Sequence, residues 1–445
     1  MAVLFKAERW MLAALLALTA LVFANALGVT FVFDDLGDIS GNTSARAATF
    51  LERLPFTNRP LTKLTYALND AAHGLVPAGY AAVNVTLHLI AITLVFLALR
   101  RAFRQSESTD ASLCALAVCL MWSVHPALTE SVTYLSGRSM VLSAVLMLGA
   151  LLAATGERPR PAIAFLCALL APLARETALV LPLILVWWQI TLGPRGRSLP
   201  VWLGTGLALL IIALLPRHRD LIAFSLDMRD PVTALRDNIH AATETLAFWL
   251  TPWRVTILPD TPPPHFWLET STLLRIAGFT LAALLAILLR RTAPIAAFAI
   301  GLALIALLPS NTIIWRADPV ALKPLYLAGL GLTLAGVSMA QRLIGARAVL
   351  ALALPVSLAL AAMTFERNKL FAGEVSLFAD AVAKTPDNAK AWIAYGSALM
   401  GEVRYYEAEA ALTRGLDLAP FDERAMNLLE LIATIRSMER PGARP

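Results

Sequence analysis

Apolar residues are grouped into long runs along the first 363 residues of the chain, and short polar stretches separate the runs. A transmembrane helix needs about 20 predominantly apolar residues, within a range of roughly 17–25, and most of the runs approach that length. The pattern therefore predicts an all-α polytopic membrane protein of about eleven transmembrane helices. The predicted spans are residues 10–27, 81–99, 111–125, 139–155, 161–174, 177–192, 199–215, 271–289, 293–309, 325–341 and 347–363.

Basic residues occupy alternate loops between these runs, and this alternation predicts an orientation. Lys6 and Arg9 precede the first run and place the N-terminus in the cytoplasm. The segment 232–251 carries several polar and charged residues, so we expect an amphipathic helix at the outer interface rather than a span. Alternation assigns five further basic loops to the cytoplasm, and they carry Arg100, Arg101 and Arg104, Arg158 and Arg160, Arg195 and Arg197, Arg290 and Arg291, and Arg342 and Arg347.

Motif-like polar segments share the other, outer side. They include FVFDDLGDIS at 31–40, NRPLTKLTY at 58–66, HPALTESVTYLSGRS at 125–139, ARET at 174–177, PRHRD at 216–220 and LPSNTIIWRADPVALKPLY at 308–326. The simplest interpretation is one site assembled from several outer loops at the membrane surface. Its candidate residues are Asp34, Asp35, Arg59, His125, Glu130, Arg138, Arg175, Glu176, Arg217, Arg219 and Lys323.

The segment after residue 363 has a different character. Pro386 and Pro420 are 34 residues apart, which is the tetratricopeptide period. Between them, Trp392, Tyr395 and Gly396 fall at the large, large and small positions of that repeat. The sequence therefore predicts two domains: a transmembrane domain at 1–363 and a small helical repeat domain at 364–445, on the outer side. A few such repeats present a concave face suited to a peptide or partner helix.

Composition excludes an ordinary soluble protein. Hydrophobic residues make up 58% of the chain and charged residues only 15%, whereas soluble domains are roughly 45–50% apolar and 25% charged. The formal net charge of +6 does not indicate a nucleic-acid partner, because the basic residues come in small clusters between apolar runs.

A series of segments, in order along most of the chain, resembles a known family. It runs FVFDD, NRPLTKLTYALND, GYAAVNVTLHL, HPALTESVTYLSGRSMVLSA, LARETALVLPLIL, LPSN and LYLAGLGL, followed by the repeats. This series is similar to bacterial relatives of the transmembrane-and-tetratricopeptide-repeat O-mannosyltransferases, in the GT-C class of polytopic glycosyltransferases. The chain departs from that family at Leu322 and Lys323, where an acid–arginine pair is usual, and in its short repeat tail.

The resemblance implies an inverting membrane glycosyltransferase. Such an enzyme moves a sugar from a polyprenyl-phosphate donor to an acceptor hydroxyl, here on the outer face of a bacterial inner membrane. The acceptor is expected to be an exported protein, such as a pilin, that contacts the repeat domain. Asp34 is then the general base, with Asp35 as its one serious competitor. The expected donor-phosphate ligands are Arg59, Arg138, Arg175, Arg217, Arg219 and Lys323, supported by His125, Glu130 and Glu176.

The same residues are also compatible with structural roles. Asp34 and Asp35 could cap a helix, and Glu130 and Arg138 could form a surface ion pair. The sequence identifies no particular cofactor, and Asp34, Asp35 and His125 could hold a divalent metal. Asn84 and His88 share one helix face and are expected to form interhelical hydrogen bonds. The whole chain could instead be a polyprenyl-lipid transporter or flippase, or an assembly scaffold that uses its repeats.

Overall fold

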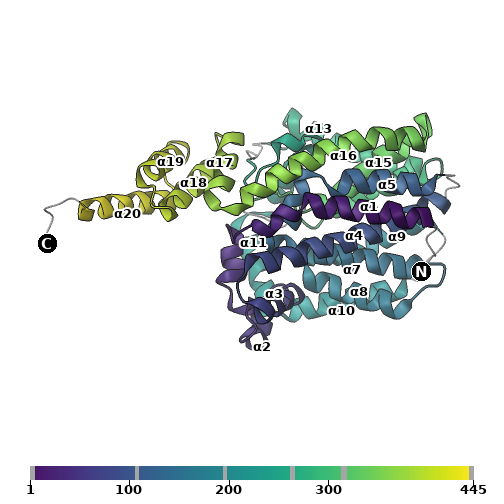
Figure 1. Cartoon of the computed structure of the whole chain (residues 1–445), viewed down its shortest axis with the longest axis horizontal. Coiled ribbons are helices and arrows are strands. Elements are labelled where there is room, and N and C mark those ends of the chain that lie inside the picture. Colours follow the sequence, from purple (N-terminus) through teal and green to yellow (C-terminus); the bar gives the residue numbers. More distant parts are fainter. Residues whose placement is uncertain (1–5, 106–109, 194–197, 261–265, 312–317, 440–445) are drawn as a thin grey trace.

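The computed structural model describes residues 6–105, 110–193, 198–260, 266–311 and 318–439, except for the side chains of Arg217 and Glu439. The predicted cytoplasmic residues Arg195 and Arg197 lie outside the described residues. Within the described part of the chain the regular structure is entirely helical. Its α-helices form an elongated bundle, and a smaller helical tail extends from one end of it (Figure 1).

The bundle is built from sixteen α-helices in the described residues. They are α1 (Lys6–Val22), α2 (Phe50–Arg53), α3 (Pro60–His73), α4 (Pro77–Gln105), α5 (Ala111–Ser123), α6 (Thr129–Val132), α7 (Arg138–Thr155), α8 (Pro161–Ala174), α9 (Leu181–Thr191), α10 (Leu199–Leu214), α11 (Pro216–Met228), α12 (Pro231–Leu250), α13 (Thr270–Leu289), α14 (Pro294–Leu307), α15 (Leu325–Ile344) and α16 (Ala346–Lys369). The tail holds α17 (Glu374–Lys384), α18 (Ala389–Gly401), α19 (Tyr405–Leu418) and α20 (Glu423–Glu439).

Every predicted span coincides with a helix, so the all-α polytopic prediction is confirmed. The count of eleven is not confirmed. In the described residues, six helices are long and apolar enough to cross a membrane, and the number rises to eight if each of two bent pairs is one span. Three further apolar helices, including α8 and α14, are shorter than 18 residues.

Small residues allow the bundle helices to pack closely. A side chain at Gly331 of α15 would lie 2.6 Å from the carbonyl oxygen of Ala299 in α14, and one at Gly204 of α10 would lie 2.5 Å from that of Phe165 in α8. Close backbone approach of this kind is typical of helices packed within a membrane, where van der Waals contact drives association. Asn84 and His88 of α4 bond to neighbouring helices as expected.

Segment 31–40 and the tail lie at the same end of the bundle, which we call the loop end. The N-terminal end of α1 lies at the opposite end (Figure 1). The backbone N–H of Thr30 donates to the carbonyl of Phe371 at 3.1 Å, which ties the two segments together. The apolar core at the loop end joins Val32 of the first segment to Leu377 and Phe378 of the tail. Which side of a membrane the loop end faces stays a prediction.

The tail consists of short packed helices. Helix α18 begins at Ala389 and α20 begins at Glu423, 34 residues later, in agreement with the repeat length read from the prolines. Gly396 of α18 faces Leu412 of α19, where a side chain would lie 2.6 Å from Leu412 Cγ. The predicted domain boundary at 363 falls inside α16, so one continuous helix joins the bundle to the tail.

The segment 232–251 is helical, and among the described helices it is not one of those apolar enough to cross a membrane, which agrees with its prediction as a helix other than a span. It forms α12, which packs against α13 and α15, and its polar residues Asp237, Asn238 and His240 are buried. They are buried because they have partners: Asp237 pairs with two arginines, and His240 bonds to Thr272 Oγ1 at 2.9 Å. Exposed apolar side chains are more numerous on the preceding helix α11 than on α12, and the position of α12 at the outer interface stays a prediction.

Candidate functional site

Asp34 and Asp35 have different surroundings although they are neighbours. The Asp35 side chain is fully buried, and its carboxylate accepts the backbone N–H groups of Ser136, at 2.7 Å, and Val32, at 3.3 Å. Burial raises the pKa of Asp35 to about 7, against the lowering effect of those hydrogen bonds. Asp35 therefore anchors its loop to the segment that precedes α7.

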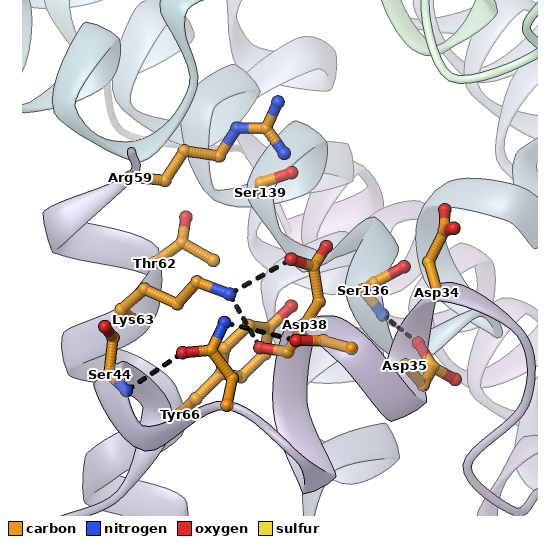
Figure 2. Close-up of polar contacts among 12 residues, drawn as sticks. Asp34, Asp35, Asp38, Ser44, Arg59, Thr62, Lys63, Tyr66, Ser136 and Ser139 are labelled. Atoms are coloured by element: carbon orange, nitrogen blue, oxygen red, sulfur yellow. Dashed lines mark hydrogen bonds and ion pairs between the residues drawn. The ribbon is translucent and has the colours of Figure 1, made fainter. Parts of the chain in front are cut away.

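The Asp34 side chain is 51% exposed, and its carboxylate lies 3.9 Å from Nζ of Lys323. Its backbone N–H donates to the hydroxyl of Tyr134 at 2.7 Å. Figure 2 shows the carboxyl groups of Asp34 and Asp35 pointing in opposite directions from adjacent positions. Of the two candidate bases, Asp34 is thus the one that a bound acceptor can reach.

Lys323 stands at the centre of a charged cluster. Its side chain is 18% exposed, and its Nζ lies 4.9 Å from the centroid of the Tyr134 ring. Burial lowers the pKa of Lys323, as do the charges of Arg175 and Arg59, while Asp34 and Glu130 raise it. Lys323 therefore lies beside Asp34, and Arg175 and Arg59, from two other segments, lie within electrostatic range of Lys323. Their mutual repulsion favours the binding of an anion among them.

Two of the predicted arginines reach this cluster with different partners. Arg175, at the end of α8, is buried and donates to Ser139 Oγ at 2.9 Å. Arg59, just before α3, donates through Nε to Glu176 at 3.2 Å. Glu176 begins the short helix η7 (Glu176–Val180) and also meets His218 at 3.3 Å. Glu176 thereby fixes the direction of the Arg59 side chain, and Figure 2 shows Arg59 above Ser139.

Arg138 occupies a different position from the one expected of a phosphate ligand. Its side chain is fully buried, and its guanidinium lies 4.5 Å from the centroid of the Tyr66 ring. Nε donates to Asn84 Oδ1 at 2.8 Å, Nη1 to Asn69 Oδ1 at 2.6 Å, and Nη2 to the Tyr80 carbonyl at 3.0 Å. Nη1 also reaches Thr65. These bonds tie α3, α4 and α7 together and direct the guanidinium toward the protein interior.

His125 and Glu130 lie deeper than Asp34. His125 stacks on Trp249, accepts the Ala127 N–H at Nδ1 and bonds through Nε2 to the Trp249 carbonyl, so both ring nitrogens have protein partners. Glu130 is buried next to Lys323 and accepts the backbone N–H of Leu322. Among the described residues no three His, Cys, Asp or Glu side chains are grouped as metal ligands. The set of Asp34, Asp35 and His125 therefore does not fit a metal.

The prediction for the two arginines of α11 can be compared with the structure only at Arg219. The side chain of Arg217 lies outside what the structure describes. Arg219 is exposed and donates through Nε to the carbonyl of Ala213 at 2.9 Å, on the preceding helix.

Some residues of the site were absent from the sequence prediction. Lys63 is buried and donates to the carbonyl of Asp38 at 2.6 Å and to its carboxylate at 3.2 Å, as Figure 2 shows. Arg367 is buried at the end of α16, where it meets Thr129 at 3.0 Å and Asp380 at 3.2 Å. Tyr134 bonds to the Asp34 backbone. Arg367 could have been found from the sequence, because it lies in the polar group FERNK at 365–369, close after the last apolar run.

The fold and the site define a class of protein before any comparison: a polytopic helical membrane protein with a charged, partly exposed cluster at one end. No protein-family profile matches the chain, and no solved structure does. Three similar proteins are the protein O-mannosyl-transferases Tmtc1 of Drosophila melanogaster, TMTC3 of Mus musculus and TMTC3 of Homo sapiens. Their identities are 34% over 202 residues, 31% over 160 and 31% over 150.

The matched parts cover 41%, 32% and 30% of this chain, but only 23%, 16% and 16% of those relatives. The chain is therefore a relative of these protein O-mannosyl-transferases over part of its length, and it spans less than a quarter of the length of each.

Proposed function

We propose that this chain is an inverting membrane glycosyltransferase. It transfers a sugar from a polyprenyl-phosphate donor to a hydroxyl group of an exported protein, at the outer face of a bacterial inner membrane. The names of the relatives favour mannose as the sugar and a protein as the acceptor. The observation that carries the proposal is the half-exposed Asp34 beside Lys323, with Arg175 and Arg59 within electrostatic reach.

Asp34 is the proposed general base. The acceptor hydroxyl oxygen attacks the anomeric carbon, and the bond from that carbon to the phosphate oxygen breaks with inversion. The hydroxyl proton passes to the Asp34 carboxylate, and the electron pair of the broken bond leaves with the polyprenyl phosphate. Proton transfer of this kind contributes about 10²–10⁴-fold to the rate. Exposure of Asp34 and burial of Asp35 favour Asp34 for this step.

Lys323, Arg175 and Arg59 are the proposed partners of the donor phosphate. An arginine gives a planar pair of N–H donors, and the lysine gives a compact charge, so together they can stabilise the leaving phosphate. Glu176 keeps Arg59 in place. Arg138 is left out of this set because its N–H groups already bond to Asn84, Asn69, Thr65 and Tyr80.

An apolar pocket supports a lipid-linked donor. It lies between α4, α7, α9, α14 and α15 and holds about 520 Å³ of empty space, part of it open to the surroundings. Its lining includes Leu327, one turn beyond Lys323, and Leu181, which directly follows the short helix that Glu176 begins. A prenyl chain in this pocket would have its phosphate near the cluster, and each buried CH₂ contributes about 0.8 kcal/mol.

Transfer by the purified, full-length protein in lipid nanodiscs tests the proposal. The donor is polyprenyl-phosphate mannose with a radiolabelled sugar, and the acceptor is a pool of peptides rich in serine and threonine. We expect labelled peptide that appears only when the protein is present, with inverted configuration at the anomeric carbon by NMR. Mass spectrometry of exported proteins from a deletion strain should show a loss of the same sugar.

Two results would contradict the proposal. Retained anomeric configuration would exclude the single displacement through Asp34. Donor that binds and crosses the bilayer of proteoliposomes, without transfer to any peptide and with an unchanged set of glycoproteins in the deletion strain, would support a polyprenyl-lipid transporter instead.

A further inference from the structure

Phe33, the residue directly before Asp34, has a backbone φ of 52°. A bulky side chain rarely adopts this left-handed conformation, which persists only where its surroundings hold it. Helix α17 of the tail makes two contacts that hold Phe33 in this conformation. The Phe33 N–H donates to Glu374 Oε1 at 2.8 Å, and the Phe33 ring meets the Phe378 ring edge to face, 5.6 Å between centroids and at 89°. The first tail helix therefore holds the conformation that sets the direction of Asp34.

The same short segment is fixed on both sides. The N–H of Thr30 donates to the Phe371 carbonyl at 3.1 Å, and its hydroxyl donates to the Ala372 carbonyl at 3.3 Å. On the opposite side, the Asp34 N–H donates to Tyr134 at 2.7 Å. Residues 30–34 thus lie between the tail and the segment that leads into α7. The orientation of Asp34 depends on both.

Helix α17 is itself bound to the bundle by charged and polar contacts. Asp380 pairs with Arg367 of α16 at 3.2 Å. Lys384 donates to the carbonyl of Val255 at 2.9 Å, and Asn388 donates to that of Leu258 at 3.1 Å. These contacts give α17 a fixed position from which Glu374 can act on Phe33.

We propose that Glu374 is a positioning residue for Asp34, so that the repeat tail aligns the general base in addition to any contact with an acceptor. This inference rests on the proposed function. Without the Glu374 carboxylate, Phe33 can leave the left-handed region, and Asp34 loses its fixed place beside Lys323. The cations that meet the donor phosphate stay where they are, since they come from other segments. Turnover should therefore fall while donor affinity is retained.

Steady-state kinetics of the full-length protein with polyprenyl-phosphate mannose and a Ser/Thr-rich peptide tests the role. For Glu374→Ala we expect kcat to fall at least about tenfold, with the donor KM within about twofold of wild type, because small misplacements of a catalytic group have large effects. Glu374→Gln keeps an oxygen that can accept the Phe33 N–H, and it should restore most of kcat. The matched control is Glu366→Ala, an exposed acid of α16 that pairs with Lys369 and should behave as wild type.

Phe378→Leu provides a second variant should Glu374→Ala fail to fold, because it removes the ring contact with Phe33 and leaves an apolar side chain in the core at this position. Its kcat should also fall with the donor KM unchanged. Wild-type kcat in monodisperse Glu374→Ala and Phe378→Leu proteins would overturn the positioning role, as would a rise in peptide KM alone. If wild type transfers sugar and these variants match it, only this inference fails. If wild type transfers none, the proposed function itself fails.

Discussion

Replacing Arg138 with lysine should destabilise the protein rather than weaken its affinity for the donor. The guanidinium donates to four residues on two other helices, Asn84, Asn69, Thr65 and Tyr80. A lysine ammonium has three N–H groups on a single atom and cannot reach acceptors on opposite sides of a planar group.

The magnitude follows from the number of acceptors left without a donor. Each buried polar group that loses its partner costs about 1–3 kcal/mol, so two of them predict a loss of about 2–6 kcal/mol. The unfolding entropy of a chain of 445 residues is about 0.9 kcal/mol/K, so such a loss lowers the melting temperature by about 2–6 °C. The lysine can still lie near Tyr66, so the contact between cation and ring is partly kept.

Fluorescence-detected melting of the detergent-solubilised protein measures the change, and donor binding is measured on the same preparation below the transition. The matched control is Arg158→Lys, an exposed arginine between α7 and α8 whose melting temperature should not move. Suppose that Arg138→Lys melted at the wild-type temperature and bound polyprenyl-phosphate mannose much more weakly. The structural role of Arg138, which is to join α3, α4 and α7, would then be refuted. Arg138 would then belong to the phosphate site.

Three further predictions address the loop, the cluster and the topology. The pKa of Asp35 is about 7 in the folded protein against 3.8 as the ordinary value, so between these pH values the folded state binds more protons and stability falls as pH rises. Asp35→Asn should flatten this slope in melting curves from pH 5 to 8, and curves parallel to wild type would contradict the burial argument. Lys323→Gln should weaken donor binding about tenfold, the effect of losing one charged hydrogen bond, and an unchanged dissociation constant would remove Lys323 from the phosphate site. On a cysteine-free background, a single cysteine at Ser397 should react with an impermeant reagent from outside in intact cells and one at Ser198 should not, whereas equal labelling would exclude the predicted orientation.

The apolar periodicity was enough to predict an all-helical polytopic protein, but not the number of its spans. All eleven apolar ranges are helices, and Asn84 and His88 make the interhelical bonds expected of polar groups within spans. The hydrophobic run of a span is a local property of the sequence. Whether a short helix such as α14 crosses a bilayer completely depends on its tilt and its neighbours, which no local pattern encodes.

The details of the site depended on contacts between distant residues. The sequence favoured Asp34 over Asp35 only slightly, because nothing in FVFDD shows that Phe33 takes a positive φ or that the two carboxyl groups point in opposite directions. The burial of Arg138 required acceptors from α3 and α4. The tail was expected to bind a partner, and its contact with Phe33 through Glu374 joins positions 341 residues apart.

The rate of sugar transfer by Asp34→Asn tests the central claim most directly. Asparagine has nearly the same shape and cannot take a proton, so transfer under single-turnover conditions should fall by at least about a hundredfold. Donor binding should be unchanged or slightly tighter, because the negative charge beside Lys323 is removed. Asp38→Asn changes a nearby carboxylate that pairs with Lys63, and it should lower the rate of transfer only slightly. A folded Asp34→Asn protein that bound donor and transferred sugar at the wild-type rate would contradict the assignment of Asp34 as the base.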